Sequence, residues 1–150
     1  MESEIRINVV YVRDDLIQIR VFGWNGAFGG TSDIYVGTDH MGKIANLLRG
    51  FPNSTSDNRE IMLGAFGPDG AGGARMRFYC ADSAGHTFVD LTIESGTLSS
   101  QHVQSVKLIL PIEASAVAQF INDLNRLDYS KNGTARLQGV PTAADFSNLV

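Results

Sequence analysis

Hydrophobic positions recur at helical spacing in two segments of this chain. Apolar residues three and four positions apart lie on one face of a helix, so each segment predicts an amphipathic helix with one buried side. In residues 113–127 this stripe consists of Val117, Phe120, Ile121, Leu124 and Leu127. In residues 38–51 it consists of Met41, Ile44, Leu47, Leu48 and Phe51, with Thr38 as the expected N-cap.

Elsewhere apolar and polar residues alternate, which is typical of strands with one buried face. Residues 5–12 and 16–22 flank the short polar stretch Arg13–Asp15, which predicts a hairpin. The alternation places Ile5, Ile7, Val9 and Tyr11 on one face of the first strand and Ile17, Ile19 and Val21 on one face of the second.

A second hairpin is predicted from residues 74–80 and 86–94, which a short segment ending in Gly85 joins. Its expected inward residues are Met76, Phe78 and Cys80 on one strand and Val89, Leu91 and Ile93 on the other. Further strands are expected near 32–36, 59–66 and 103–110, with a short edge strand at 134–139 as an option. Residues 23–30, half of them glycine, are expected to form a loop or a bent strand.

The resulting order is β-β-β-α-β-β-β-β-α with an optional final strand. Because hairpins dominate, we expect an α+β fold: a mostly antiparallel sheet of about six to eight strands with both helices on one face. The length predicts one domain over 1–150, with a weakly ordered tail at about 140–150. A strand-then-helix unit occurs twice, which is the pattern that an internal duplication would produce. The two halves share no residue pattern beyond this periodicity.

Composition and charge narrow the expected partners and cellular location of the protein. The net charge is −4 and no run of basic residues exists, which argues against nucleic-acid binding. The single cysteine precludes an internal disulfide, and no apolar run is long enough to span a membrane. The N-terminus lacks the features of a signal peptide. We therefore expect a cytoplasmic protein without a membrane partner.

Catalytic and cofactor signatures are weak. The glycine-rich segment lacks the Lys and Ser/Thr of a phosphate-binding loop, and His40, His86 and His102 lack metal-ligand spacing. Cys80 is interpreted as a buried structural residue. His86 with Asp82 or Asp90 is the cluster that an enzyme would require. The expectation is no enzyme, no cofactor and no metal.

Two groups of residues are candidates for binding a protein partner. Trp24, Asn25 and Phe28 lie on the glycine-rich segment, where aromatic side chains either form a recognition surface or fold back onto the core. Asp90 and Glu94 lie on the outward face of the second hairpin, where they are either solvated charges or part of an acidic patch.

Four stretches carry a family resemblance: FGWNGAFGGTSDIYV, LLRGFP, RFYCADSAGHTFVDLTIE and LILPIEASAVAQFINDLNRL. Together they resemble a group of small bacterial single-domain α+β proteins of unknown function, which are loosely similar to immunity or accessory proteins of toxin systems. The absent catalytic constellation, the acidic balance and the aromatic residues of the glycine-rich segment favour a non-enzymatic module that binds a protein partner. A homodimer through an unpaired edge strand is an option. The alternatives are a protein that binds a small apolar ligand in a pocket between sheet and helices and, less favoured, an enzyme.

Overall fold

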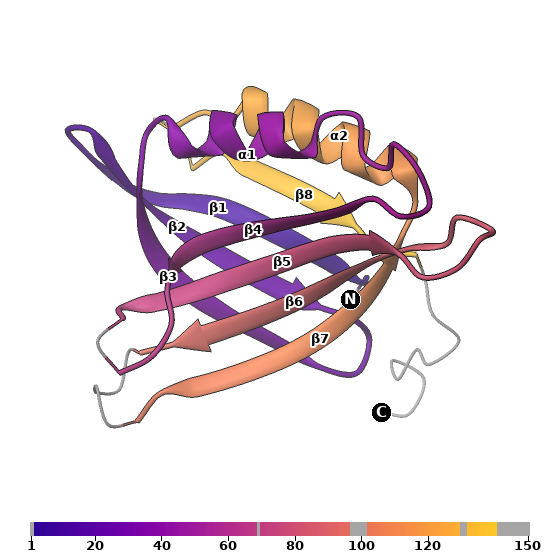
Figure 1. The fold of residues 1–150 in the computed structure, drawn as a ribbon. Helices are drawn as coiled ribbons and strands as arrows, with labels where there is room; N and C mark the ends of the chain where they lie inside the picture. The colour runs from indigo at the N-terminus through magenta and orange to yellow at the C-terminus, as the bar shows by residue number, and fades with distance from the viewer. Residues whose placement is uncertain (1, 69, 97–101, 130–131, 141–150) are drawn as a thin grey trace.

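The computed structural model describes residues 2–68, 70–96, 102–129 and 132–140 as two helices and eight strands (Figure 1). Sheet A has the strand order β3-β2-β1-β8 and sheet B the order β4-β5-β6-β7, with every pairing antiparallel. The strands are β1 Glu4–Arg13, β2 Leu16–Trp24, β3 Gly29–Gly37, β4 Asn58–Ala65, β5 Gly72–Cys80, β6 Thr87–Ser95, β7 Gln104–Ile112 and β8 Thr134–Gln138. The helices are α1 His40–Leu48 and α2 Ala114–Asn125.

The α+β class, the antiparallel pairing and the order of elements are confirmed, and β8 is the optional final strand. The strands divide into two sheets of four that face each other (Figure 1). Each sheet has one apolar face, and another layer of the protein must pack on that face to shield it from water. The inward side chains of both sheets and of both helices form one hydrophobic core, to which all the predicted inward residues of β2 and β6 belong.

The topology contains an internal two-fold equivalence. Residues 4–65 form β1-β2-β3-α1-β4, and residues 72–138 form β5-β6-β7-α2-β8, the same order of elements. In sheet A, β8 pairs with β1, and in sheet B, β4 pairs with β5. The fourth strand of each half therefore completes the sheet of the other half. The two halves therefore share a topology although they share no residue pattern, and this shared topology supports the duplication hypothesis.

The helices lie side by side across the side of the molecule where β4 and β8 run (Figure 1). Both predicted stripes face the core, with Met41 and Phe120 fully buried. Two details of the predicted first helix were wrong. Leu47 is 55% exposed, and Asp39 rather than Thr38 occupies the N-cap position, where its side chain makes no capping hydrogen bond.

A β-bulge overturns the prediction that Tyr11 faces inward with Ile5, Ile7 and Val9. The β1–β2 register runs from Val9 opposite Ile19 to Tyr11 opposite Gln18, so β1 contains one extra residue there. An extra residue reverses the alternation beyond it. Tyr11 consequently points to the outer face of sheet A and is 51% exposed.

The glycine-rich segment 23–30, expected to be a loop or a bent strand, forms a tight hairpin turn and the adjoining ends of β2 and β3. Its first two residues belong to β2 and its last two to β3, which leaves a turn at 25–28. Gly26 has a φ of 97°, which favours glycine. Gly29 leaves room for the Trp24 indole, because a Cβ at that position would lie 2.8 Å from the ring.

Candidate functional site

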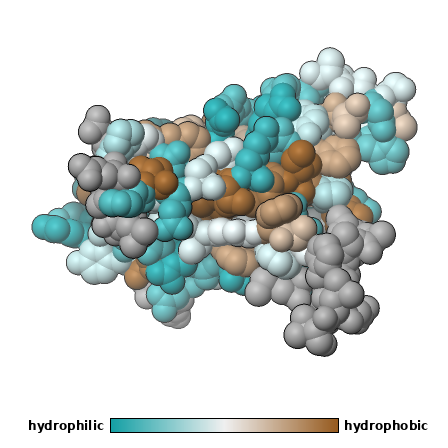
Figure 2. Space-filling model, turned by 90° about the horizontal axis from the view of Figure 1, so that it is seen from below, coloured by the Kyte–Doolittle hydropathy of each residue, from teal (hydrophilic) through white to brown (hydrophobic). Residues whose placement is uncertain are grey.

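The side of the molecule opposite the helices is bordered by two terminal strands, β3 of sheet A and β7 of sheet B. Figure 2 shows this side, which we call the open edge, with a stripe of hydrophobic side chains between polar margins. A hollow of about 300 Å³ lies along it, lined in part by Ile93 and Val106 and by the polar residues Thr31 and Gln104. The open edge therefore combines accessible apolar surface with two strands that have a neighbour on one side.

The 25–28 turn is tied to the open edge by Asn25. The Asn25 Oδ1 accepts hydrogen bonds from the backbone N–H groups of Ala27 at 2.9 Å and Phe28 at 2.8 Å. Its Nδ2 donates to the carbonyl of Ile109 on β7 at 3.2 Å. Phe28 and Ile109 are 61% and 47% exposed. One amide side chain thus holds the turn closed and links sheet A to sheet B beside two exposed apolar residues.

The three turn residues predicted to bind a partner have different roles. Trp24 is half-buried, with its ring against Gly29, so it covers the hairpin. Asn25 makes structural hydrogen bonds. Phe28 alone of the three presents a large exposed apolar surface.

Asp90 lies in the middle of the outer face of sheet B and is held by its neighbours. Its carboxylate accepts hydrogen bonds from the Tyr79 hydroxyl at 2.8 Å and from Arg77 Nη2 at 3.1 Å. The Arg77 guanidinium also lies 4.4 Å from the centre of the Tyr79 ring. Burial, and secondarily the bond to Asp90, raises the pKa of the Tyr79 phenol above its ordinary value. Asp90 is opposite Ile109 across the β6–β7 pair, which places it near the turn.

Glu94 lies at the other end of β6, away from that turn. Its side chain accepts a hydrogen bond from the backbone N–H of Gly67, and its carbonyl accepts one from Ser32 Oγ at 2.8 Å. Glu94 therefore positions the β4–β5 connection and joins the two sheets. The structure brings Asn25, Phe28 and Asp90 toward Ile109 but leaves Glu94 apart.

The outer face of sheet B has mixed charge rather than an acidic surface. Arg75 faces Glu60 at 3.6 Å and Arg77 faces Asp90 at 3.1 Å, around a shallow hollow of about 160 Å³ that Lys107 also lines. Arg77 thus pairs with a carboxylate of β6, whereas Arg75 turns to β4. This mixture argues against an acidic patch on this face.

His86 pairs with Asp82 on an exposed turn between β5 and β6. The His86 Nδ1 atom lies 2.6 Å from the Asp82 carboxylate. This carboxylate also accepts hydrogen bonds from the backbone N–H groups of Ala84 and His86. These bonds, chiefly that of the imidazole, lower the pKa of Asp82 below its ordinary value. The pair stabilises the turn. Cys80 differs from its expected buried state, because it is half-exposed at the end of β5 and its Sγ donates to the Ser54 carbonyl at 3.8 Å.

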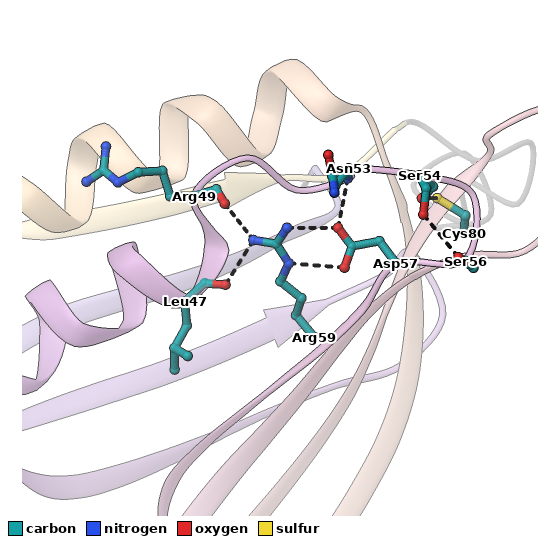
Figure 3. Close-up of polar contacts among 8 residues, drawn as sticks. All are labelled: Leu47, Arg49, Asn53, Ser54, Ser56, Asp57, Arg59 and Cys80. Atoms are coloured by element: carbon teal, nitrogen blue, oxygen red, sulfur yellow. Dashed lines mark hydrogen bonds and ion pairs between the residues drawn. The ribbon is translucent and has the colours of Figure 1, made fainter.

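A polar cluster that the sequence did not reveal joins α1 to β4 (Figure 3). Arg59 donates to both carboxylate oxygens of Asp57, at 2.8 Å and 3.1 Å. Its Nη1 also donates to the carbonyls of Leu47 at 3.1 Å and Arg49 at 2.6 Å, which lie at the C-terminal end of α1. A cation at a helix C-terminus is electrostatically favourable. We call this group the Arg59 clasp.

The clasp predicts a pH dependence of stability. The hydrogen bond from the Arg59 guanidinium is the main reason that the pKa of Asp57 lies below its ordinary value of 3.8. A carboxyl whose pKa is lowered by folding stabilises the protein above its unfolded pKa, and this contribution disappears as the pH falls through the folded pKa. Asp57→Asn should therefore lower the free energy of unfolding by about 1–2 kcal/mol at pH 7. In urea titrations, the gap between variant and wild type should be constant above about pH 5 and shrink below the ordinary pKa. A gap that widens in acid would contradict this sign.

A hollow of about 560 Å³ lies between α2 and β8 and is lined mostly by polar and charged residues. Gln119 donates its amide to Asp123 at 2.9 Å, and Asp123 accepts the backbone N–H of Arg136 at 3.2 Å. The Arg136 side chain in turn pairs with Glu4 at 2.6 Å. The bond from Asp123 thus satisfies one backbone N–H on the otherwise free edge of β8.

Within the part of the chain that the structure describes, no group of three or more His, Cys, Asp or Glu side chains is placed to hold a metal ion. Neither α1 nor α2 has the length and apolar character that crossing a membrane requires. The expectations for the tail beyond residue 140 lie outside the described residues. Comparisons with protein-family models, curated proteins and solved structures found no match to this chain.

Proposed function

We propose that this protein is a non-enzymatic interaction module that binds a protein partner at the open edge. The observation that carries the proposal is the exposed apolar stripe between two terminal strands, with Phe28 and Ile109 beside it. Large exposed apolar surface rimmed by polar residues marks interaction sites. Aromatic residues at such sites supply much of the binding energy.

The arrangement of the open edge favours a partner that binds through an extended segment of its chain. A peptide can add to a terminal strand through backbone hydrogen bonds and place one side chain in an adjoining pocket. β7 carries Pro111, which has no N–H group, and Lys107, and both residue types protect edges from pairing. β3 contains no proline, so it is the more receptive edge. The hollow lined by Ile93 and Val106 would take an aliphatic or aromatic side chain of the partner.

A toxin-immunity-like role in the bacterial cytosol is the specific form of this proposal. It rests on the family resemblance of the sequence and on the small size of the chain. In that role the partner is a toxin domain, and binding at the open edge would block its action.

Binding of a small apolar ligand is the less favoured function. The space between the sheets and the helices is filled by buried side chains such as Met41, Leu48, Phe78 and Phe120. The hollow between α2 and β8 is lined mostly by polar and charged residues, whereas apolar ligands bind in pockets lined mainly by apolar side chains.

The open-edge proposal predicts that Ile109→Lys abolishes partner capture. Immobilised wild-type protein should retain a partner in stoichiometric amount from a lysate of its own cells, quantified by mass spectrometry. Ile109→Lys should reduce the retained amount at least tenfold, because it places a charge beside the apolar stripe on which the partner would pack. Leu47→Lys is the matched control: Leu47 is similarly exposed but lies on α1, on the side of the molecule opposite the open edge (Figure 1). Equal loss in both variants, or no stoichiometric partner for the wild type, would contradict the proposal.

A further inference from the structure

A groove runs along the edge of β8, beside α2. The two elements lie side by side (Figure 1), and the hollow of about 560 Å³ between them is within the size range of ligand-binding sites. Its α2 side extends from Glu113 to Asp123, and its β8 side extends from Arg136 to Val140. We call this hollow the β8 groove. It is separate from the open edge, which β3 and β7 border.

The hydrogen bonds at the two ends of β8 show which of its backbone groups face the groove. The Gly133 carbonyl accepts from the Val9 N–H, and the Gly139 N–H donates to the Ser3 carbonyl, both at 2.9 Å. In an antiparallel pair such bonds involve every second residue of a strand, so the odd-numbered residues of β8 bond to β1. The even-numbered residues therefore direct their N–H and C=O groups away from β1.

The side chain of Asp123 shows that these even-numbered groups face α2. It accepts the backbone N–H of Arg136 at 3.2 Å, which closes one part of the edge. Among the described residues, no group bonds to the N–H or the C=O of Gln138, although Gln138 lines the groove. A strand edge with unpaired N–H and C=O groups is a template for a further strand.

We propose that the β8 groove binds an extended peptide segment of a protein partner, which adds to the edge of β8 as a new strand. The N–H and C=O of Gln138 would pair with one residue of the peptide, as in other complexes that extend a sheet. The α2 side of the groove, from Glu113 to Asp123, is about 15 Å long at 1.5 Å per residue. This length holds about four to five extended residues at 3.3 Å each.

The groove has a negative charge that its own residues do not balance. Arg136 is the one cation among the lining residues that the structure describes, and it lies 2.6 Å from Glu4. The Glu4 side chain is only 9% exposed, so Arg136 is held by a carboxylate outside the groove. Asp123 is occupied by Gln119 and by the N–H of Arg136. An unbalanced anion in the groove therefore has to be another residue.

Glu113 is that anion, and it favours a peptide that carries a lysine or an arginine. It is exposed, and no hydrogen bond or ion pair within the described part of the chain occupies its carboxylate. The Val140 N–H donates to the Pro111 carbonyl at 2.8 Å, which places the residues after Gln138 beside the start of α2. Glu113 thus lies at the Gln138 end of the groove. A cationic side chain of a peptide paired with Gln138 would form a charge-assisted hydrogen bond with Glu113.

A nuclear magnetic resonance titration with a synthetic probe tests the site. The probe is acetyl-Thr-Val-Lys-Val-Thr-amide, whose β-branched residues favour an extended chain. Added to isotope-labelled wild-type protein, it should shift the amide signal of Gln138 saturably, with a dissociation constant on the order of 100 μM. The absence of a saturable shift at about 2 mM probe, or shifts confined to other parts of the protein, would overturn the proposal.

Gln138→Pro tests the added strand itself. Proline removes the N–H that faces the groove while every bond of β8 to β1 is kept, so probe binding should weaken at least tenfold. Thr134→Pro is the matched control, because its N–H also points away from β1 but it lies at the start of β8, outside the groove. It should bind the probe like the wild type. Equal weakening in the two variants would contradict pairing at Gln138.

Glu113→Gln tests the charge preference in a variant whose exposed position leaves the fold intact. The wild type should bind the lysine probe at least fivefold more tightly than the same peptide with norleucine, and Glu113→Gln should abolish this preference. Glu60→Gln, on the outer face of sheet B, should keep it. Ile109→Lys should bind the probe normally, so failure here is separable from failure at the open edge. A preference that survives in Glu113→Gln would refute the role of Glu113.

Discussion

Phe78→Ala should lower the free energy of unfolding by about 3–5 kcal/mol, the range for removing a buried aromatic ring. Phe78 is fully buried on β5, an inner strand of sheet B. Its ring meets Phe51 edge-on, with 5.8 Å between centroids and 72° between planes. Such a loss is a large share of the total stability of a domain, about 5–15 kcal/mol. Urea unfolding followed by circular dichroism measures it.

Phe88→Ala is the matched control for this prediction. Phe88 lies on the neighbouring strand but points outward, where its ring stacks on Tyr79 with 6.0 Å between centroids. Because that ring is half-buried and leaves no enclosed cavity, we expect a loss below about 1.5 kcal/mol. Similar losses in both variants would mean that β5 does not have the buried environment described above.

The fold was predictable from the sequence where alternation or helical spacing is regular. The 74–80 and 86–94 segments alternate without interruption, and they form the β5–β6 hairpin with Val89, Leu91 and Ile93 buried. Alternation specifies which side of a strand is buried, but it does not say which strands share a sheet. The division into two sheets depends on β4 and β8 crossing between halves. β4 pairs with the next strand, β5, rather than with sheet A, and β8 pairs with β1 at the other end of the chain.

Two local features could not be inferred from periodicity. The bulge in β1 contains no glycine or proline that would indicate it in the sequence, so Tyr11 was assigned to the wrong face. Leu47 fits the helical spacing of α1 but lies outside the core because this helix contacts its neighbours on a narrow face. In both cases the packing of other elements decides the orientation of the side chain.

The candidate sites show the same limit. Phe28 is exposed on the tight 25–28 turn, whereas Trp24, which was named with it, packs against Gly29. Asp90 and Glu94 were interpreted as solvated charges or as part of an acidic patch, yet they accept hydrogen bonds from Tyr79 and Gly67. Charge on an outward face of a strand is visible in a sequence, whereas its partners on other strands are not.

Arg59→Ala should lower the free energy of unfolding by about 2–3 kcal/mol, because charge-assisted hydrogen bonds in partly buried positions are lost together. The variant removes both bonds to Asp57 and both bonds to the carbonyls at the end of α1. Asp57 would then be left poorly accessible without its cation. Thermal unfolding at pH 7 and urea titration measure the loss.

Arg20→Ala is the matched control, since Arg20 also forms a two-bond pair, with Asp33. The Arg20 side chain is 51% exposed against 23% for Arg59, so solvent screens its pair and the loss should stay below about 1 kcal/mol. A difference between the two variants would locate the stabilisation in the connection from α1 to β4. That connection carries the chain from sheet A to sheet B, where β4 completes the sheet of the other half. Equal losses would mean that the core alone holds β4 in place and that the clasp has the small effect of a surface pair.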